Sequence, residues 1–326
     1  MFCSFNQRNS TRFLPLSWRI ASWGFALLAI ALSPSPLSAE EAPKAEAAAP
    51  AATQDVGSPE RIIIEPAKIV LTGSRAQQQL LVTGFYPGGE IRDLTGSVQF
   101  LSSAPEVAPI TNGVVHPATN GQSHIVVHVN GLVAVAEAVV QGMETPSRVV
   151  FKQDMLAALT KTGCNMGACH GSPSGKGGFR LSLRGYDPPL DIYTLRSEFF
   201  GRRTNIMDPA DSLLLKKPLM EVAHGGGRRV KKGDVSYQVM HDWIAEGMKL
   251  DPAEEPDLVS VKIYPENRVF RPGAERQQIV LMGTFSDGSV RDLTPLACYS
   301  SSNENVAKVN DDGLVTKTAR GETAVL

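Results

Sequence analysis

The residues best suited to chemistry in this 326-residue chain are Cys164, Cys169 and His170. Covalent attachment of haem needs two thiols, which add to the two vinyl groups, and an imidazole directly after the second thiol, which binds the iron. Two residues usually separate the cysteines, whereas four separate them here. Gly167 gives this longer loop the backbone freedom to present both sulfurs to one porphyrin. The segment therefore predicts haem c, attached through both cysteines and bound to iron by His170.

Two other interpretations of these cysteines stay open. A disulfide between Cys164 and Cys169 is the main alternative, because neighbouring thiols oxidise readily in exported proteins. Closing so short a loop stabilises a fold little, however, and a disulfide does not explain His170. A zinc site is less favoured, since the four-ligand spacing is missing and Cys298 lies in another segment. We expect Cys298, which follows Leu296 and Ala297, to be a small buried apolar residue.

A second axial ligand is predicted from the loop that precedes the last helix of this region. His224 is favoured because the glycines that follow it allow the loop to approach a porphyrin closely. Ligation by two imidazoles gives a lower reduction potential than ligation by histidine and methionine. Met220, in the same loop, is the alternative ligand. His241 is expected to be a surface or half-buried helix residue.

Charge is balanced over the whole chain but not within it. The 32 lysines and arginines against 33 aspartates and glutamates give a net charge of −1, which predicts no nucleic-acid partner. Residues 151–250 carry fifteen basic and ten acidic side chains. This excess would attract an acidic redox partner, whose identity the sequence does not reveal. Four arginines could also pair with the haem propionates. These are Arg202, Arg203, Arg228 and Arg229.

The periodicity of apolar residues indicates which elements hold the cysteine loop. A helical period predicts helices over 154–161, before the loop, and over 236–246. A third short helix is expected over 209–217, after Asp208. Residues 179–184 alternate between apolar and polar types, which is typical of a strand or hairpin edge.

A repeated segment flanks this helical region. Residues 84–95 recur as 283–294, an offset of 199, and both copies end in Arg-Asp-Leu-Thr. Short alternating runs separated by turn residues predict an antiparallel β-sandwich for each copy. The first copy continues through 126–140, whereas the second stops at Leu326. We therefore expect the second sandwich to be truncated and the chain to be the N-terminal part of a longer protein.

The N-terminus has the features of an export signal. Arg8, Arg12 and Arg19 precede an apolar run over 20–32, and small residues at 37–39 suit cleavage. Residues 1–39 are thus predicted to be a signal peptide, and 40–60 a disordered Ala/Pro-rich linker. An uncleaved anchor is the alternative. After cleavage no membrane span is expected, and the protein would be periplasmic or at the cell surface.

Two family resemblances agree with this organisation. The repeats resemble bacterial Ig-like group 2 domains, most clearly over 285–294 and 301–315. The helical region resembles the cytochrome-c-like domain of large exported planctomycete proteins, in which Ig-like domains commonly flank that domain. The residues that carry the second resemblance are 163–171, 179–187, 201–203, 212–218, 224–227 and 237–247.

The expected fold is thus multidomain, with all-β Ig-like sandwiches over 61–145 and 258–326 and a small, mainly α, cytochrome-c-like domain over 150–252. The predicted function is that of an exported electron carrier or redox sensor with one covalent haem, and not that of a catalyst. The sandwiches would act as spacers or docking modules, and could contact cell-surface polysaccharide or protein. The alternative is a structural or carbohydrate-adhesive surface protein in which Cys164 and Cys169 form a disulfide.

Overall fold

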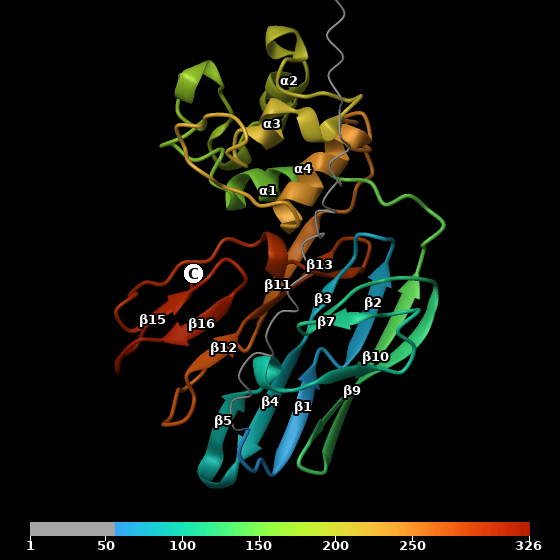
Figure 1. Ribbon diagram of the computed structural model, residues 1–326, viewed down its shortest axis with the longest axis vertical. Helices are drawn as coiled ribbons and strands as arrows, with labels where there is room; N and C mark the ends of the chain where they lie inside the picture. Colours follow the sequence, from blue (N-terminus) through green and yellow to red (C-terminus); the bar gives the residue numbers. More distant parts are fainter. Residues whose placement is uncertain (1–55) are drawn as a thin grey trace, which may run out of the picture. The chain divides into compact units, whose positions relative to one another are not determined.

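The computed structural model describes residues 56–326 (Figure 1). Regular structure in this part is mostly β-sheet, with four short α-helices between two strand-rich segments. The predicted signal peptide and residues 40–55 of the predicted linker lie outside the described residues. The prediction of disorder does not hold at Val56, near the end of the predicted linker, because Val56 packs against the apolar core of the first strand-rich segment. The carbonyl of Val56 also accepts a hydrogen bond from the Tyr86 hydroxyl.

The first strand-rich segment forms three sheets, in the orders β1-β4-β5, β2-β10-β9-β6 and β3-β8-β7. All pairings are antiparallel except that of β10 with β2. Its ten strands are β1 (Arg61–Glu65), β2 (Lys68–Thr72), β3 (Gln78–Gln79), β4 (Leu81–Tyr86), β5 (Glu90–Asp93), β6 (Phe100–Ser102), β7 (Ile110–Thr111), β8 (Val114–Val115), β9 (Gly121–Val129) and β10 (Leu132–Gln141).

The core of this segment is formed by every second residue of its long strands, because buried and more exposed side chains alternate along them. In β9, Ile125 and Val127 are fully buried, while the residues between and beside them are more exposed. In β10, Ala136 and Ala138 are buried in the same way and leave room for the facing sheet. Each fully buried valine or isoleucine contributes about 1.5–3 kcal/mol to folding. This arrangement is compatible with a β-sandwich.

The second strand-rich segment reproduces six of these strands. Its sheets have the orders β11-β13-β14 and β12-β16-β15, which match β1-β4-β5 and β3-β8-β7. Within residues 258–326 no sheet corresponds to β2-β10-β9-β6, and the apolar residues of β11 stay exposed, with Val259 at 66%. Its strands are β11 (Leu258–Tyr264), β12 (Arg276–Gln278), β13 (Val280–Phe285), β14 (Val290–Asp292), β15 (Ala307–Val309) and β16 (Leu314–Lys317).

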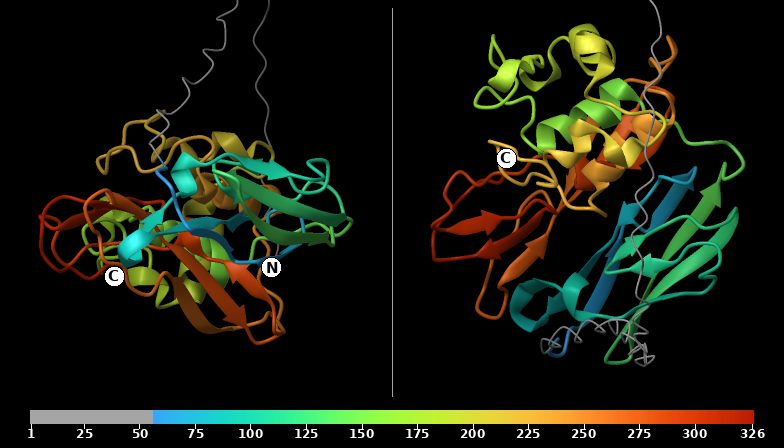
Figure 2. Two further views of the ribbon diagram at one scale, coloured as in Figure 1. Left: turned by 90° about the horizontal axis from the view of Figure 1, so that it is seen from below. Right: turned by 45° about the horizontal axis from the view of Figure 1, so that its top comes forward.

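The helical region packs around Trp243 and Phe151, whose ring centres are 5.1 Å apart. Both residues are fully buried, and the helices gather in one region of the ribbon, coloured green to orange (Figure 2). The helices are short, and a cytochrome-like helical domain is not evident in the described part of the chain. The four helices are α1 (Leu156–Lys161), α2 (Pro188–Arg196), α3 (Leu213–Lys216) and α4 (Val235–Ala245).

Two helix predictions are confirmed. Residues 154–161 form the end of a π-turn and then α1, and residues 236–246 correspond to α4. The predicted helix over 209–217 is divided, because Ser212 has an extended backbone (ψ 135°) that separates a 3-10 turn from α3. The sequence analysis missed α2, although Asp187 caps it by accepting a hydrogen bond from the Leu190 N–H (3.1 Å) and prolines begin it.

Two further predictions are wrong. Residues 179–184 form no strand, since their backbone groups bond the cysteine loop and a buried carboxylate instead of a neighbouring strand. The Leu181 N–H donates to the His170 carbonyl (2.7 Å), and the Ser182 N–H donates to Asp191 Oδ1 (2.6 Å). Cys298 is exposed, not buried, whereas its neighbour Tyr299 packs against the small core of this segment.

The repeated Arg-Asp-Leu-Thr motif joins the two strand-rich segments reciprocally. Asp93 Oδ2 accepts a hydrogen bond from the Gln278 N–H (2.5 Å), and Asp292 Oδ2 accepts one from the Gln79 N–H (2.6 Å). Both pairs obey the offset of 199, so each repeat supplies the acceptor for the other repeat's backbone. Each segment therefore donates one of these two hydrogen bonds and accepts the other.

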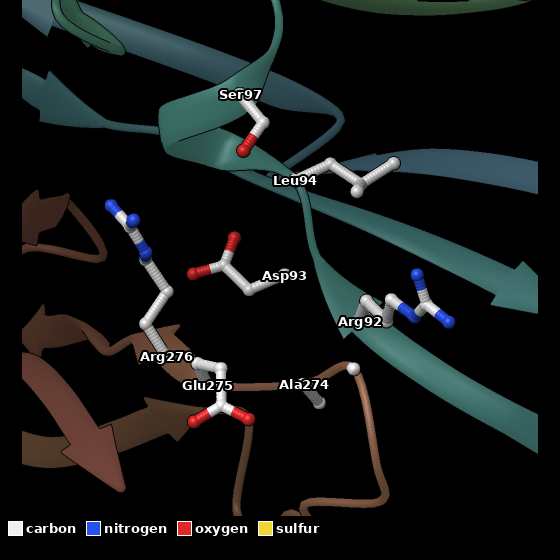
Figure 3. Close-up of a pocket in the computed structure, with 8 residues that line it drawn as sticks. Arg92, Asp93, Leu94, Ser97, Ala274, Glu275 and Arg276 are labelled. Atoms are coloured by element: carbon white, nitrogen blue, oxygen red, sulfur yellow. The ribbon is translucent and has the colours of Figure 1, made fainter. Parts of the chain in front are cut away.

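The second oxygen of each aspartate serves its own repeat. Asp93 Oδ1 accepts from the Thr95 N–H, and Asp292 Oδ1 accepts from the Thr294 N–H, both at 2.8 Å. Figure 3 shows the Asp93 carboxylate between its own strand and the segment that carries Arg276, beside a cavity of about 30 Å³. Burial raises the pKa of both carboxyl groups, although these hydrogen bonds oppose the rise.

Replacing Asp93 tests this exchange. Asp93→Ala leaves the N–H groups of Thr95 and Gln278 without their acceptor, so we expect the free energy of unfolding to fall by about 2–4 kcal/mol. Asp93→Asn keeps one acceptor and buries no charge, so the loss should be smaller. Chemical denaturation measures both, with Asp312→Asn, at an exposed position, as the control. An Asp93→Ala variant as stable as the wild type would contradict the assignment.

The pH dependence of stability, compared between the wild type and Asp93→Asn, gives a second test. Because burial raises the pKa of Asp93 above 3.8, the folded state holds the proton more tightly than the unfolded state. The unfolding free energy of the wild type should therefore rise relative to Asp93→Asn as the pH falls through the raised pKa, and the rise should be complete below 3.8. Denaturation curves between neutral pH and that value check this, and parallel curves would refute it.

Candidate functional site

The end of α1 places the first cysteine. Gly163 adopts a left-handed backbone (φ 75°) immediately after the last turn, as is common where a helix stops. The Cys164 N–H then donates to the Leu159 carbonyl (2.9 Å), which closes the helix end and fixes the start of the loop. The Cys164 side chain packs against the helical core, with its sulfur 3.2 Å from Thr162 Oγ1.

The loop from Cys164 to Gly171 folds back on itself. The His170 N–H donates to the Cys164 carbonyl (2.9 Å), and the Gly171 N–H donates to the Met166 carbonyl (3.0 Å). A Cβ atom at Gly171 would lie 2.1 Å from the Asn165 carbonyl oxygen, so only glycine fits there. This closure brings both cysteines and His170 into one short turn.

Both thiols are free in the structure and partly buried. Burial raises the pKa of the Cys164 thiol, and the nearby Cys169 adds to this, whereas Thr162 and Arg229 oppose it. Cys164 is therefore a neutral thiol at pH 7. Addition of a thiol across a vinyl group needs such reduced sulfurs and not a disulfide.

His170 is anchored by its Nδ1 atom, which lies 2.9 Å from the Phe179 carbonyl oxygen. Because a carbonyl only accepts, Nδ1 carries the proton and Nε2 keeps a free lone pair. The Phe179 ring also packs beside the imidazole, at 4.4 Å between centres. Burial lowers the pKa of His170, and nearby His224 lowers it further, so the ligating neutral form is favoured.

His224 repeats this anchoring from a distant part of the sequence. Its Nδ1 atom lies 2.8 Å from the Gly227 carbonyl oxygen, so Nε2 is again the free nitrogen. A Cβ atom at Gly226 would come within 2.8 Å of the His224 ring, which explains the glycine at this position. The ring centres of His170 and His224 are 6.4 Å apart, and the ring planes differ by 17°.

The other predicted residues differ in their placement. Met220 has a left-handed backbone (φ 65°) and is 44% exposed. Arg203 is buried and already paired with Glu198 (2.8 Å), so it is poorly placed to bind a propionate. Arg202 and Arg228 are exposed, and their pairing with propionates remains a prediction. His241 is half-buried in α4, beside Asp242, as expected.

The donor set of this loop is of the kind that a covalent haem requires. Two free thiols would form the thioether bonds, and two imidazoles that are hydrogen-bonded through Nδ1 would bind the iron through Nε2. The Asn165 side chain beside Cys164 is fully buried, and its Oδ1 has no hydrogen-bond partner within residues 56–326. The residues present thus fit the cofactor.

The described residues contain no group of three or more His, Cys, Asp or Glu side chains positioned to hold a metal ion. None of the helices within residues 56–326 combines the length and apolar character needed to cross a bilayer. Comparison with family models finds no match, and comparison with curated proteins finds none either. The site therefore has to be interpreted from its own geometry.

Sequence analysis gave no role to Phe179 or Asn165. Phe179 was grouped with an expected strand, and only the folded loop shows that its carbonyl orients His170. Asn165 directly follows Cys164, but its buried amide, which donates to Thr160 Oγ1 (2.9 Å), becomes visible only in the structure. The only signal in the sequence is that Asn165 lies within 163–171 and Phe179 within 179–187, two of the segments that carry the resemblance to the cytochrome-c-like domain.

The loop closure can be tested at its glycine. Gly171→Ala places a methyl group against the Asn165 carbonyl, so we expect the unfolding free energy to fall by more than about 2 kcal/mol. Gly225→Ala is the matched control, because the nearest atom to its new Cβ is a lysine side-chain carbon at 3.8 Å. Thermal and chemical denaturation of the two variants should differ clearly, and equal stability would contradict this geometry.

The environment of His170 gives a second test. Burial and His224 both lower its pKa, so its imidazole should titrate below 6.5 in the unliganded protein. The unfolding free energy contributed by this group is present above 6.5 and is lost as the pH falls through the lowered pKa. NMR titration of the ring protons measures the value, and His224→Asn should raise it. A pKa of 6.5 or above for the wild type would exclude the described burial.

Proposed function

We propose that the helical region is an exported c-type cytochrome module that carries single electrons through one covalent haem. Cys164 and Cys169 would form the thioether bonds, His170 would bind the iron on one side, and His224 would bind it on the other. The observation that carries the proposal is the pair of imidazoles that are anchored through Nδ1 and lie 6.4 Å apart.

The spacing of the rings supports two axial histidines. A metal ion bound by two imidazoles at about 2 Å each separates the ring centres by about 6 Å. The observed 6.4 Å agrees with this value although the rings come from segments 54 positions apart. Met220 remains the alternative ligand, but it lacks a comparable anchored approach to His170.

The haem would supply reversible one-electron chemistry, and the residues of this chain would tune and enclose it. The Phe179 and Gly227 carbonyls fix the tautomer and orientation of each histidine and increase its basicity as a ligand. The Phe179 ring covers one side of His170 and limits the access of water. Exposed Arg202 and Arg228 would pair with the propionates, and ligation by two imidazoles would favour a low reduction potential.

The strand-rich segments fit spacer or docking roles as Ig-like modules. Their reciprocal aspartate contacts join the two repeats at fixed positions along the chain. Such a pair could orient the helical region toward a redox partner, or contact a surface polysaccharide or protein. We place the mature protein in the periplasm or at the cell surface, in keeping with the signal peptide predicted for residues 1–39.

Expression of the chain in a host that matures c-type cytochromes tests the proposal. We expect a c-type visible spectrum and peroxidase staining that survives a denaturing gel, because the haem is covalently bound. The double variant Cys164→Ser/Cys169→Ser should lose nearly all of this staining. His241→Asn, at a helix position away from the pair, is the control and should stain normally.

The sixth ligand is tested in the same preparation. His224→Asn should convert a low-spin spectrum to a high-spin one, whereas Met220→Leu should leave it unchanged. The reverse outcome would assign the iron to Met220. A colourless protein with Cys164 joined to Cys169 would instead support the structural or adhesive alternative, and mass spectrometry without reductant distinguishes the two states.

A further inference from the structure

The turn that follows α2 presents two adjacent phenylalanines in an unusual way. Phe199 and Phe200 both have a left-handed backbone, with φ values of 52° and 58°. Bulky residues rarely adopt this conformation, because the side chain crowds the neighbouring carbonyl groups. Two in succession form a strained turn that needs a compensating interaction.

The described fold provides little compensation through burial. Phe199 is 58% exposed, and Phe200 is as exposed as a side chain in an extended chain. Exposed phenylalanine also forgoes the favourable free energy of removing its ring from water. Strain and exposure together indicate that these rings serve a contact outside the described chain.

The turn is held rigidly from within. Buried Arg203 donates to the carbonyls of Thr194 (2.9 Å) and Glu198 (3.3 Å) and pairs with the Glu198 carboxylate. Its guanidinium also lies 5.3 Å from the centre of the Phe199 ring. The two rings are therefore displayed by a fixed scaffold, which reduces the entropy lost on binding.

The surroundings of the turn define the chemistry of its partner. Tyr193, in the α2 helix that leads into the turn, is 58% exposed. Arg196 and Arg202 lie on either side of the phenylalanines in sequence, and both are exposed. The carboxylate within the turn, Glu198, is neutralised by its ion pair and would not repel an anionic surface.

We propose that this Phe199–Phe200 tip binds the surface of an anionic lipid bilayer. The rings would enter the interfacial layer, where apolar side chains leave water without needing a shaped pocket. Arg196 would contact lipid phosphates, whose charge and geometry suit a guanidinium group. Two apolar anchors with flanking positive charge provide the two signals that stable peripheral binding needs. The proposal does not depend on haem.

Vesicle binding by the full chain tests the proposal. We expect binding to vesicles of phosphatidylcholine with phosphatidylglycerol, and much weaker binding to phosphatidylcholine alone. Phe199→Ser/Phe200→Ser should weaken binding to the anionic vesicles at least about tenfold. Val269→Ser, which alters a 74% exposed apolar residue in another segment, should bind as the wild type does. Equal binding by the double variant and the wild type would overturn the proposal.

A local probe separates the tip from any other membrane-active part of the chain. In Phe200→Trp, the added tryptophan fluorescence should shift to shorter wavelength with anionic vesicles and should be quenched by brominated acyl chains. Arg196→Gln should reduce the effect and its dependence on salt. Added fluorescence that keeps its solvent-exposed wavelength would refute insertion, even if the chain binds vesicles, and would assign the tip to a protein partner.

Discussion

The close approach of Gly171 to the Asn165 carbonyl is the constraint on which the candidate site depends. No side chain larger than hydrogen fits there, and the tight turn that results sets Cys164, Cys169 and His170 on one short loop. The neighbouring hydrogen bonds, from His170 to Cys164 and from Gly171 to Met166, keep this turn closed. A more open loop would separate the thiols from the imidazole.

The loop alone does not complete the site, because both imidazoles need orientation from elsewhere. The Phe179 carbonyl fixes His170, and the carbonyl of Gly227, in the His224 loop, fixes the second ring. Each anchor occupies Nδ1, so Nε2 is the nitrogen of each ring that the proposed iron would use. Backbone carbonyls thus hold both imidazoles in place. Both carbonyls belong to irregular segments, and such segments leave little room for regular helix in this region.

In the flanking repeats, the aspartate of one motif stabilises its own repeat and also binds the other repeat. Asp93 and Asp292 each bind a threonine N–H in their own repeat and a glutamine N–H in the other. These two hydrogen bonds offset part of the cost of burying each carboxylate, whose pKa stays raised. Duplication of the motif therefore produces a reciprocal contact.

Several features were determined by the sequence itself. The offset of 199 predicted matching strands, and the helical period predicted α1 and α4, because local patterns record which face of an element is buried. Tertiary structure decided the rest: the meeting of His170 with His224, the pairing of Arg203 with Glu198, the exposure of Cys298, and the absence of a strand over 179–184. These depend on contacts between residues far apart in the chain, and no local pattern specifies which distant groups will satisfy a buried donor or charge.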